Sequence, residues 1–154
     1  MALQTGDKAP PFALATDGGG EASLAKLKGR PVVLYFYPKD DTSGCTREAL
    51  EFTKLGKKFE ALGVAVIGVS KDSPASHDRF KAKHRLRLVL ASDPETRIAQ
   101  AYGVWVEKSL YGRTYMGMER ATFLIDGAGK IRQVWRKVKV PGHAEAVLGA
   151  AKSL

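Results

Sequence analysis

The chain has 154 residues, of which 44% are hydrophobic and 27% charged, and its formal net charge is +9. This balance is typical of a single soluble globular domain, residues 1–154, and the scattered basic residues match no recognisable nucleic-acid-binding motif. The single cysteine excludes an intrachain disulfide scaffold and a cysteine-rich zinc site.

The first half of the chain predicts a strand, a helix and a second strand. The apolar run VVLYFY at 32–37 indicates a buried strand that Pro38 ends. After a polar loop, we expect a helix from near Cys45 to Gly63. Its apolar face has four residues at helical spacing: Phe52, Leu55, Phe59 and Leu62. The run at 64–69 predicts the second strand, which should lie parallel to the first.

The second half predicts three more helices and three strands. Ser73-Pro74 has the pattern of a helix start, and we expect that helix to reach about Arg85. Asp93-Pro94 repeats the pattern before a short helix to about Tyr102. The remaining elements are a short strand at 88–91, a hairpin of strands at 121–126 and 130–136, and a closing helix at 143–152. This order predicts an α/β fold with a mixed central sheet and helices on both faces.

Cys45 is the candidate for chemistry. A lone cysteine is usually an inert apolar residue, but this one follows a polar loop at the predicted start of a helix. The partial positive charge of a helix N-terminus favours the thiolate. At an ordinary pKa of about 8.5, about 3% of a thiol is ionised at neutral pH, so full ionisation gains only about thirtyfold in rate. Efficient chemistry at this thiol therefore also needs a nearby hydroxyl and a fixed cation.

Two residues offer these groups. Thr42 lies three residues before Cys45, although a threonine there is also an ordinary N-cap or turn residue. Arg120 directly precedes the predicted strand ATFLID, although an arginine there is also an ordinary surface residue.

The stretch FYPKDDTSGCTREA closely resembles the active-site segment of peroxiredoxins, whose signature places Pro38, Thr42 and Cys45 at fixed spacing. The subgroup it resembles is the bacterioferritin-comigratory-protein type, also called PrxQ, which carries an arginine before a TFLID-like strand, here Arg120. The segments GDKAPPFAL, GVSKDSPASHDRFKAKH and SDPETRIAQAYGVW also look like this subgroup, so the resemblance spans nearly the whole chain.

The resemblance implies a thioredoxin-like fold and a role for each motif residue. Cys45 would be the peroxidatic nucleophile and would become a sulfenic acid. Thr42 would hydrogen-bond the peroxide, and Arg120 would stabilise the thiolate and polarise the peroxide. Pro38 would shield the thiolate from water.

Two more residues complete the expected site. Backbone N–H groups near Gly44 and Cys45 should bind the peroxide oxygens, as helix starts bind anions. Glu48 is expected in the first helical turn, mainly as a charge that suits a helix start, with a further role in ordering the arginine or the loop. No metal-ligand spacing or dinucleotide loop is present in the sequence, so we expect no cofactor and no metal.

Two positions depart from the subgroup. Ser43 stands where proline is common, which should leave activity intact. Leu50 stands where many members have a second, resolving cysteine, and the predicted helix at 73–85 has none either. The chain therefore resembles a one-cysteine enzyme whose sulfenic acid is reduced by thioredoxin, glutaredoxin or glutathione. An intermolecular Cys45–Cys45 disulfide stays open, and the subgroup favours a monomer.

Location and partners follow from what the sequence lacks. The N-terminal segment has no signal-peptide pattern, and the apolar runs are too short to cross a bilayer, so we expect a cytoplasmic protein without a membrane partner. A non-enzymatic redox sensor on the same fold and a polyanion binder driven by the +9 charge remain alternatives. We expect His77, His84 and His143 to be surface or partly buried structural residues, and the aromatic stretch 111–115 to pack in the core or a hairpin.

Overall fold

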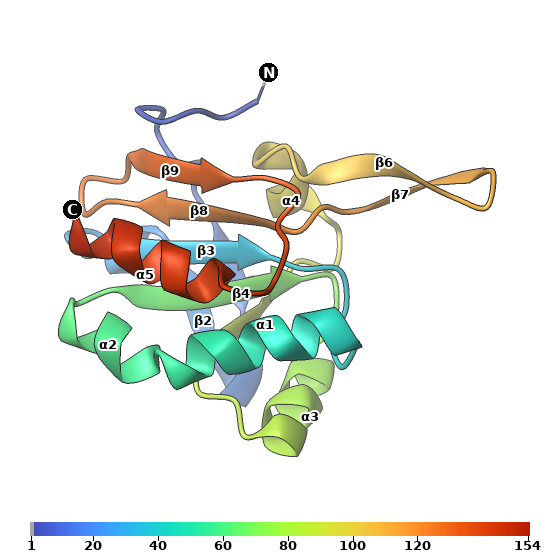
Figure 1. The fold of residues 1–154 in the computed structure, drawn as a ribbon, viewed down its shortest axis with the longest axis horizontal. Coiled ribbons are helices and arrows are strands. Elements are labelled where there is room, and N and C mark those ends of the chain that lie inside the picture. The colour runs from blue at the N-terminus through green and yellow to red at the C-terminus, as the bar shows by residue number, and fades with distance from the viewer. Residues whose placement is uncertain (1) are drawn as a thin grey trace.

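The computed structural model describes residues 2–154, which form a central five-stranded sheet of order β5-β4-β3-β8-β9 (Figure 1). The strands are β3 (Val32–Phe36), β4 (Ala65–Ser70), β5 (Val89–Ser92), β8 (Ala121–Ile125) and β9 (Ile131–Trp135). The central strand β3 runs parallel to β4 and antiparallel to β8, so the parallel and antiparallel halves of the sheet meet there. The predicted mixed sheet is confirmed.

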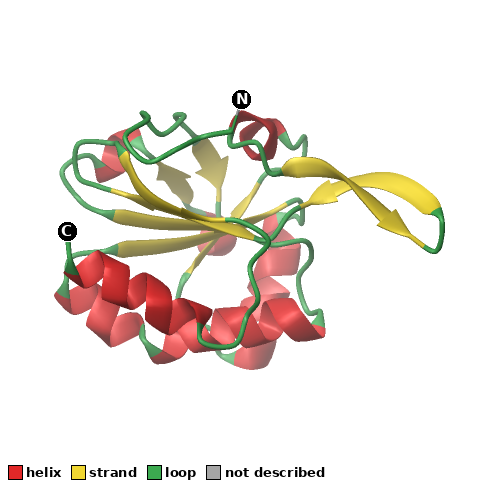
Figure 2. Cartoon of the chain, turned by 45° about the horizontal axis from the view of Figure 1, so that its top comes forward, coloured by secondary structure: helices red, strands yellow, loops and turns green. Residues whose placement is uncertain are grey.

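Helices cover both faces of the sheet (Figure 2). One face carries α1 (Ser43–Lys54), α2 (Gly56–Ala61), α3 (Pro74–His84) and α5 (His143–Lys152). The other face carries α4 (Arg97–Ala101), the small hairpin of β1 (Ala13–Ala15) and β2 (Glu21–Ser23), and the 3-10 helices η1 (Asp17–Gly19) and η2 (Ala25–Leu27). Because β3 is covered on both sides, all five of its residues are buried, which explains its unbroken apolar sequence.

The predicted long helix after Cys45 is in fact two helices. The backbone leaves helical geometry at Leu55 (φ −92°, ψ 3°), and α2 begins at Gly56, a residue of low helix propensity. Phe52 and Phe59 are buried as expected, but Leu62 lies beyond the end of α2 and is 40% exposed. The prediction of a four-residue apolar face was therefore wrong for its last residue, Leu62.

The helix after Asp93 starts later than its sequence pattern indicates. The Asp93 carboxylate accepts hydrogen bonds from the backbone N–H groups of Ile98 (3.3 Å) and Ala99 (2.8 Å), so its capping role is real. The helix α4 nevertheless begins at Arg97, because Thr96 holds a left-handed backbone conformation with φ 60°.

A second hairpin was not expected from the sequence. Strands β6 (Trp105–Leu110) and β7 (Arg113–Met118) pair with each other and project from the body of the molecule (Figures 1 and 2). Tyr111 and Gly112 form its tip, both with positive φ, as in the tight turns that suit the twist of a hairpin. Tyr111 is 96% exposed, so the stretch 111–115 lies in a hairpin, one of the two expected settings, and not in the core.

Candidate active site

The start of α1 places Cys45 in the first helical turn. Because the first helical hydrogen bond runs from the Thr46 N–H to the Thr42 carbonyl, the N–H groups of residues 43–45 lie before the hydrogen-bonded part of the helix. Cys45 itself is only 2% exposed and packs with residues of β3 and α1. The thiol therefore lies at the positive end of a helix, in a nearly closed setting.

Arg120 directly precedes β8, which pairs with β3 in the sheet, and so brings a guanidinium to the thiol from 75 residues away in the sequence. Its Nη2 lies 3.3 Å from Cys45 Sγ, and its Nη1 donates to Glu48 Oε1 at 2.7 Å. Burial lowers the pKa of Arg120, but the charges of Glu48 and Cys45 raise this pKa by more than burial lowers it, so the net shift is upward. Arg120 is therefore a permanent cation beside the sulfur.

The close approach of Arg120 explains why residue 44 is a glycine. A Cβ at this position would lie 3.2 Å from Arg120 Nη2, closer than most side-chain contacts. The absence of a side chain lets the guanidinium approach the helix start, beside the free N–H groups.

Glu48 is more deeply buried than its position on the predicted helix indicated. Since α1 begins at Ser43, Glu48 lies in the second turn, and the expectation of a first-turn charge was wrong. Its carboxyl is 1% exposed, and within residues 2–154 Oε2 has no hydrogen-bond partner. Burial raises the pKa of Glu48 to about 7, partly offset by the charge and hydrogen bond of Arg120.

This buried carboxyl makes stability depend on pH. Between the ordinary value of 4.5 and about 7, the folded state binds more protons at Glu48 than the unfolded state, so stability falls as pH rises. The loss is on the order of 3 kcal/mol above pH 7. Glu48→Gln, which keeps an acceptor for Arg120, should remove this loss. Its melting temperature should exceed that of the wild type at pH 8 and match it more closely at pH 5.

His143 gives the opposite pH dependence and must be measured alongside. Burial and the Arg120 charge lower its pKa to about 4, and Nε2 lies 2.7 Å from Thr122 Oγ1. Its contribution to stability is lost as pH falls from about 6.5 to 4. Melting curves of Glu48→Gln should therefore rise between pH 4 and 6.5 and then level off. Parallel curves for wild type and variant would contradict the raised pKa.

Thr42 and Pro38 lie in the chain segment between β3 and Cys45, and both are exposed. Thr42 occupies the N-cap position of α1, but its side chain caps no N–H group of the described helix. Instead its hydroxyl donates to the Lys39 carbonyl at 2.9 Å. With its proton engaged, the Thr42 oxygen can offer only lone pairs to a bound molecule.

Lys108 is a second cation near the site that the sequence did not single out. It lies on β6 at the base of the projecting hairpin, where Nζ donates to the Met118 carbonyl. Burial and the charge of Arg120 lower the pKa of Lys108, whereas Cys45 raises it. A Cβ at Gly117 would lie 3.0 Å from the Lys108 side chain, so this glycine leaves room for the lysine stem.

The histidines are more buried than expected. His77 and His143 are both buried, which corrects the expectation of surface or partly buried residues, while His84 is partly buried and pairs with Asp41. His77 also has a carboxylate partner, Asp40, at 2.7 Å, which sequence spacing did not reveal.

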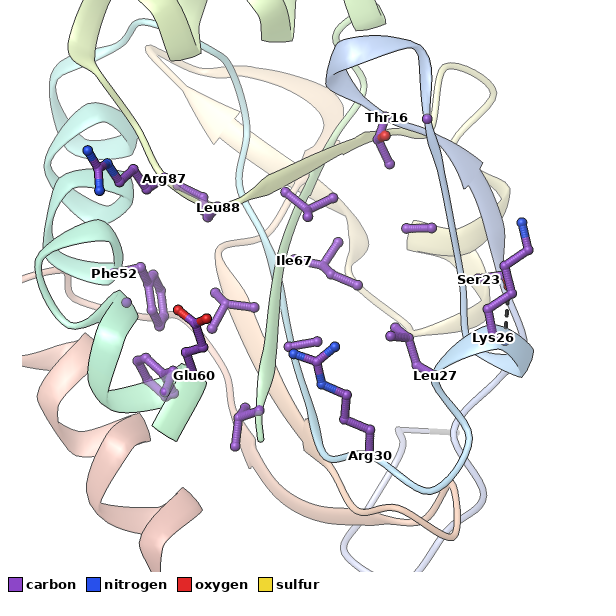
Figure 3. A pocket seen from close by; sticks show the side chains of 18 of the residues that line it. Thr16, Ser23, Lys26, Leu27, Arg30, Phe52, Glu60, Ile67, Arg87 and Leu88 are labelled. Carbon is purple, nitrogen blue, oxygen red and sulfur yellow. Dashed lines mark hydrogen bonds between the residues drawn. The ribbon is translucent and has the colours of Figure 1, made fainter. Parts of the chain in front are cut away.

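A pocket of about 490 Å³ lies elsewhere, between the N-terminal segment and α2 (Figure 3). Lys26, Arg30 and Arg87 lie around apolar side chains such as Phe52 and Ile67, and Cys45 does not line it. Within residues 2–154, no helix is long and apolar enough to cross a membrane. The same part of the chain contains no group of three or more potential metal ligands.

Comparison with known proteins agrees with this geometry. Residues 5–134 match the AhpC/TSA family. Peroxiredoxin Bcp of Bacillus subtilis is 45% identical over 100% of this chain and 98% of its own length. Peroxiredoxin Bcp of Xanthomonas campestris is 46% identical over 91% and 88%, respectively.

Solved structures show the same fold. A PrxQ variant from Xylella fastidiosa superposes with a TM-score of 0.94 at 40% identity, covering 99% of this chain and 98% of that one. Peroxiredoxin Q of Xanthomonas campestris gives a TM-score of 0.88 at 45% identity, covering 92% and 90%. The predicted thioredoxin-like fold is thereby confirmed. The chain belongs to the AhpC/TSA family and is a single-cysteine peroxiredoxin of the Bcp or PrxQ type, an enzyme that reduces peroxides with electrons from thiols.

Proposed function

We propose that Cys45 is the nucleophile and that it reduces hydrogen peroxide and organic hydroperoxides. The observation that carries this proposal is the 3.3 Å contact between Arg120 Nη2 and Cys45 Sγ at the start of a helix. The thiolate sulfur attacks one peroxide oxygen, an S–O bond forms and the O–O bond breaks. The other oxygen leaves and takes up a proton from solvent, giving water or an alcohol, while the transferred O–H makes Cys45 a sulfenic acid.

The neighbouring groups suit the charge that moves during this step. Negative charge passes from the sulfur to the leaving oxygen, and a fixed cation with preorganised N–H donors stabilises it without reorganisation. Arg120 supplies the cation, and the N–H groups of Gly44 and Cys45 supply the donors. Thr42 Oγ1 accepts a hydrogen bond from the O–H of the incoming hydroperoxide, which orients the hydroperoxide toward the sulfur.

Pro38 and Glu48 support the site from either side. Pro38 lies two residues beyond the end of β3, where its ring excludes water from the thiolate side and its fixed φ limits the loop. Glu48 holds one arm of the guanidinium through the 2.7 Å bond from Nη1, which leaves Nη2 directed at the sulfur.

The substrate range is inferred from a solved relative, and the recycling from the single thiol. A solved structure of the Xanthomonas campestris protein is described in terms of alkyl peroxide reduction, which supports organic hydroperoxides as substrates here. With no second cysteine in the chain, the sulfenic acid is reduced by an external thiol: thioredoxin, glutaredoxin or glutathione. The protein works as a cytoplasmic monomer formed by one domain, residues 1–154.

The test is mass spectrometry of Cys45 after stoichiometric peroxide, followed by turnover with dithiothreitol, thioredoxin and glutathione in parallel. Rapid sulfenylation should be followed by sustained peroxide consumption with at least one reductant, which identifies the reductant class. A thiol that reacts slowly and does not turn over would contradict the proposal and favour the non-enzymatic sensor.

A further inference from the structure

The active-site loop, residues 37–42, is tied to α3 by a carboxylate. Asp40 lies two residues before Thr42 and five before Cys45, and its side chain is directed to α3 rather than to solvent. Its Oδ2 lies 2.7 Å from His77 Nδ1, and the two side chains are 4% and 0% exposed. A fully buried contact thus joins the loop that carries the peroxiredoxin motif to a helix outside that motif.

The geometry requires a proton at both nitrogens of His77 in the ionised pair. Nδ1 faces the Asp40 carboxylate, and Nε2 lies 3.0 Å from the Ala91 carbonyl of β5, which can only accept. Both ring nitrogens therefore donate, one to the active-site loop and one to the sheet. The imidazole fixes the distance between the loop and the edge of the sheet.

Asp40 accepts two further side-chain hydrogen bonds. The Tyr37 hydroxyl donates to Oδ1 at 2.6 Å, and the Ser76 hydroxyl donates to Oδ2 at 2.8 Å. The Asp40 backbone N–H donates in turn to Asp72 Oδ2 at 2.8 Å. Hydrogen-bonded in this way, the buried pair is satisfied, and removal of one partner would leave the other uncompensated.

A second tether is exposed and therefore weaker. Asp41 accepts from Lys83 Nζ and pairs with His84 Nε2, both at 2.7 Å, and it holds a left-handed conformation with φ 60°. Ion pairs at the surface contribute little to stability because solvent screens them. The buried pair of Asp40 and His77 is the contact able to hold the loop.

We propose that His77 and Asp40 are positioning residues that hold residues 40–45 in the reactive geometry. This inference rests on the proposed role of Cys45 as nucleophile. Neither residue touches the sulfur or the peroxide. They act by fixing the loop that carries Thr42 and the free N–H groups at the start of α1, where a displacement of about 1 Å is enough to lower the rate about a hundredfold.

The experiment compares His77→Leu, Asp40→Asn and Phe80→Leu with the wild-type chain. Phe80 is buried on α3, like His77, and makes none of these hydrogen bonds. Phe80→Leu therefore serves as a control that lowers stability but keeps the contact between Asp40 and His77. Three quantities are measured: the second-order rate constant for oxidation of Cys45 by hydrogen peroxide, hydrogen exchange of the amides at 39–46, and the melting temperature.

His77→Leu and Asp40→Asn should each lower the oxidation rate constant at least about tenfold and accelerate exchange in the loop by a similar factor. Phe80→Leu should lower the melting temperature but change both loop quantities less than about twofold. His77→Gln, which keeps a donor for Asp40, should lie between His77→Leu and the wild type.

Equal effects of Phe80→Leu and His77→Leu on the oxidation rate would overturn the positioning role, because generic loss of packing would then explain both. If His77→Leu does not fold, two other measurements decide. The positioning role is also overturned if nitrogen NMR of the wild-type protein shows an unprotonated ring nitrogen at His77 and if Asp40→Asn leaves hydrogen exchange in the loop unaltered. Failure of the proposed function can be told apart from failure of the positioning role. In that case the wild type itself would show no oxidation of Cys45, while hydrogen exchange in the loop would still respond to His77→Leu and Asp40→Asn.

Discussion

Cys45→Ser should reduce peroxide consumption to the background rate of the assay. A serine hydroxyl stays protonated at neutral pH and is a poor nucleophile toward an O–O bond, so the helix start and Arg120 have no thiolate to present. The side chain is small and buried, so the fold should persist with a similar far-ultraviolet circular dichroism spectrum. The measurement is peroxide loss with excess dithiothreitol.

The matched control is Ser43→Pro, two residues earlier in the same helical turn. Ser43 is the first residue of α1, where proline is well tolerated, and proline is common there in the PrxQ subgroup. This variant should keep its activity. Retained turnover in Cys45→Ser would refute the assignment of the nucleophile, whatever the behaviour of the control.

Arg120→Met should lower the second-order rate constant with hydrogen peroxide by roughly 10²–10³, the usual effect of removing one preorganised donor to developing charge. Methionine keeps much of the side-chain volume, so packing around β8 is changed little.

This variant also leaves Glu48 buried without its cation, which would destabilise the fold for a separate reason. The double variant Arg120→Met, Glu48→Gln removes both charges and should recover stability but not activity. If the double variant regains the wild-type rate, Arg120 serves the fold rather than the reaction. Melting temperatures and rate constants of the single and double variants separate these two outcomes.

The sequence predicted those parts of the fold that local patterns determine. β3 and β4 are continuous apolar runs, Ser73-Pro74 marks the start of α3, and the side chain of Ser73 indeed accepts a hydrogen bond from the Ser76 N–H. The closing helix was predicted with its observed bounds, 143–152. The break at Leu55 was not foreseen, because the apolar spacing of Phe52 and Phe59 fits one continuous helix as well as two.

The site was predictable only in part. Cys45 and Arg120 are 75 residues apart, and nothing local in the sequence joins them, so their pairing came from the resemblance to peroxiredoxins. The contact between Asp40 and His77 had no such support. Its signal lies in the parallel pairing of β3 with β4, which brings the loop after β3 beside the start of α3, and in the two aspartates that this loop carries.

The hairpin of β6 and β7 was missed because nearly all of its strand residues are exposed or only partly buried, so its strands lack the apolar alternation that marks a half-buried strand. Its polar and aromatic residues resemble a loop in sequence.

Because the hairpin projects from the rest of the molecule, its tip is a suitable site for insertions. Tyr111 and Gly112 stand at the end of a two-stranded ribbon that extends away from the sheet (Figure 1). Exposed loop tips of this kind accept inserted sequences and are cut first by proteases. An affinity tag or a genetically encoded fluorophore inserted between Tyr111 and Gly112 would therefore leave the packed body unaltered, and limited proteolysis there would yield two fragments that remain associated through the central sheet.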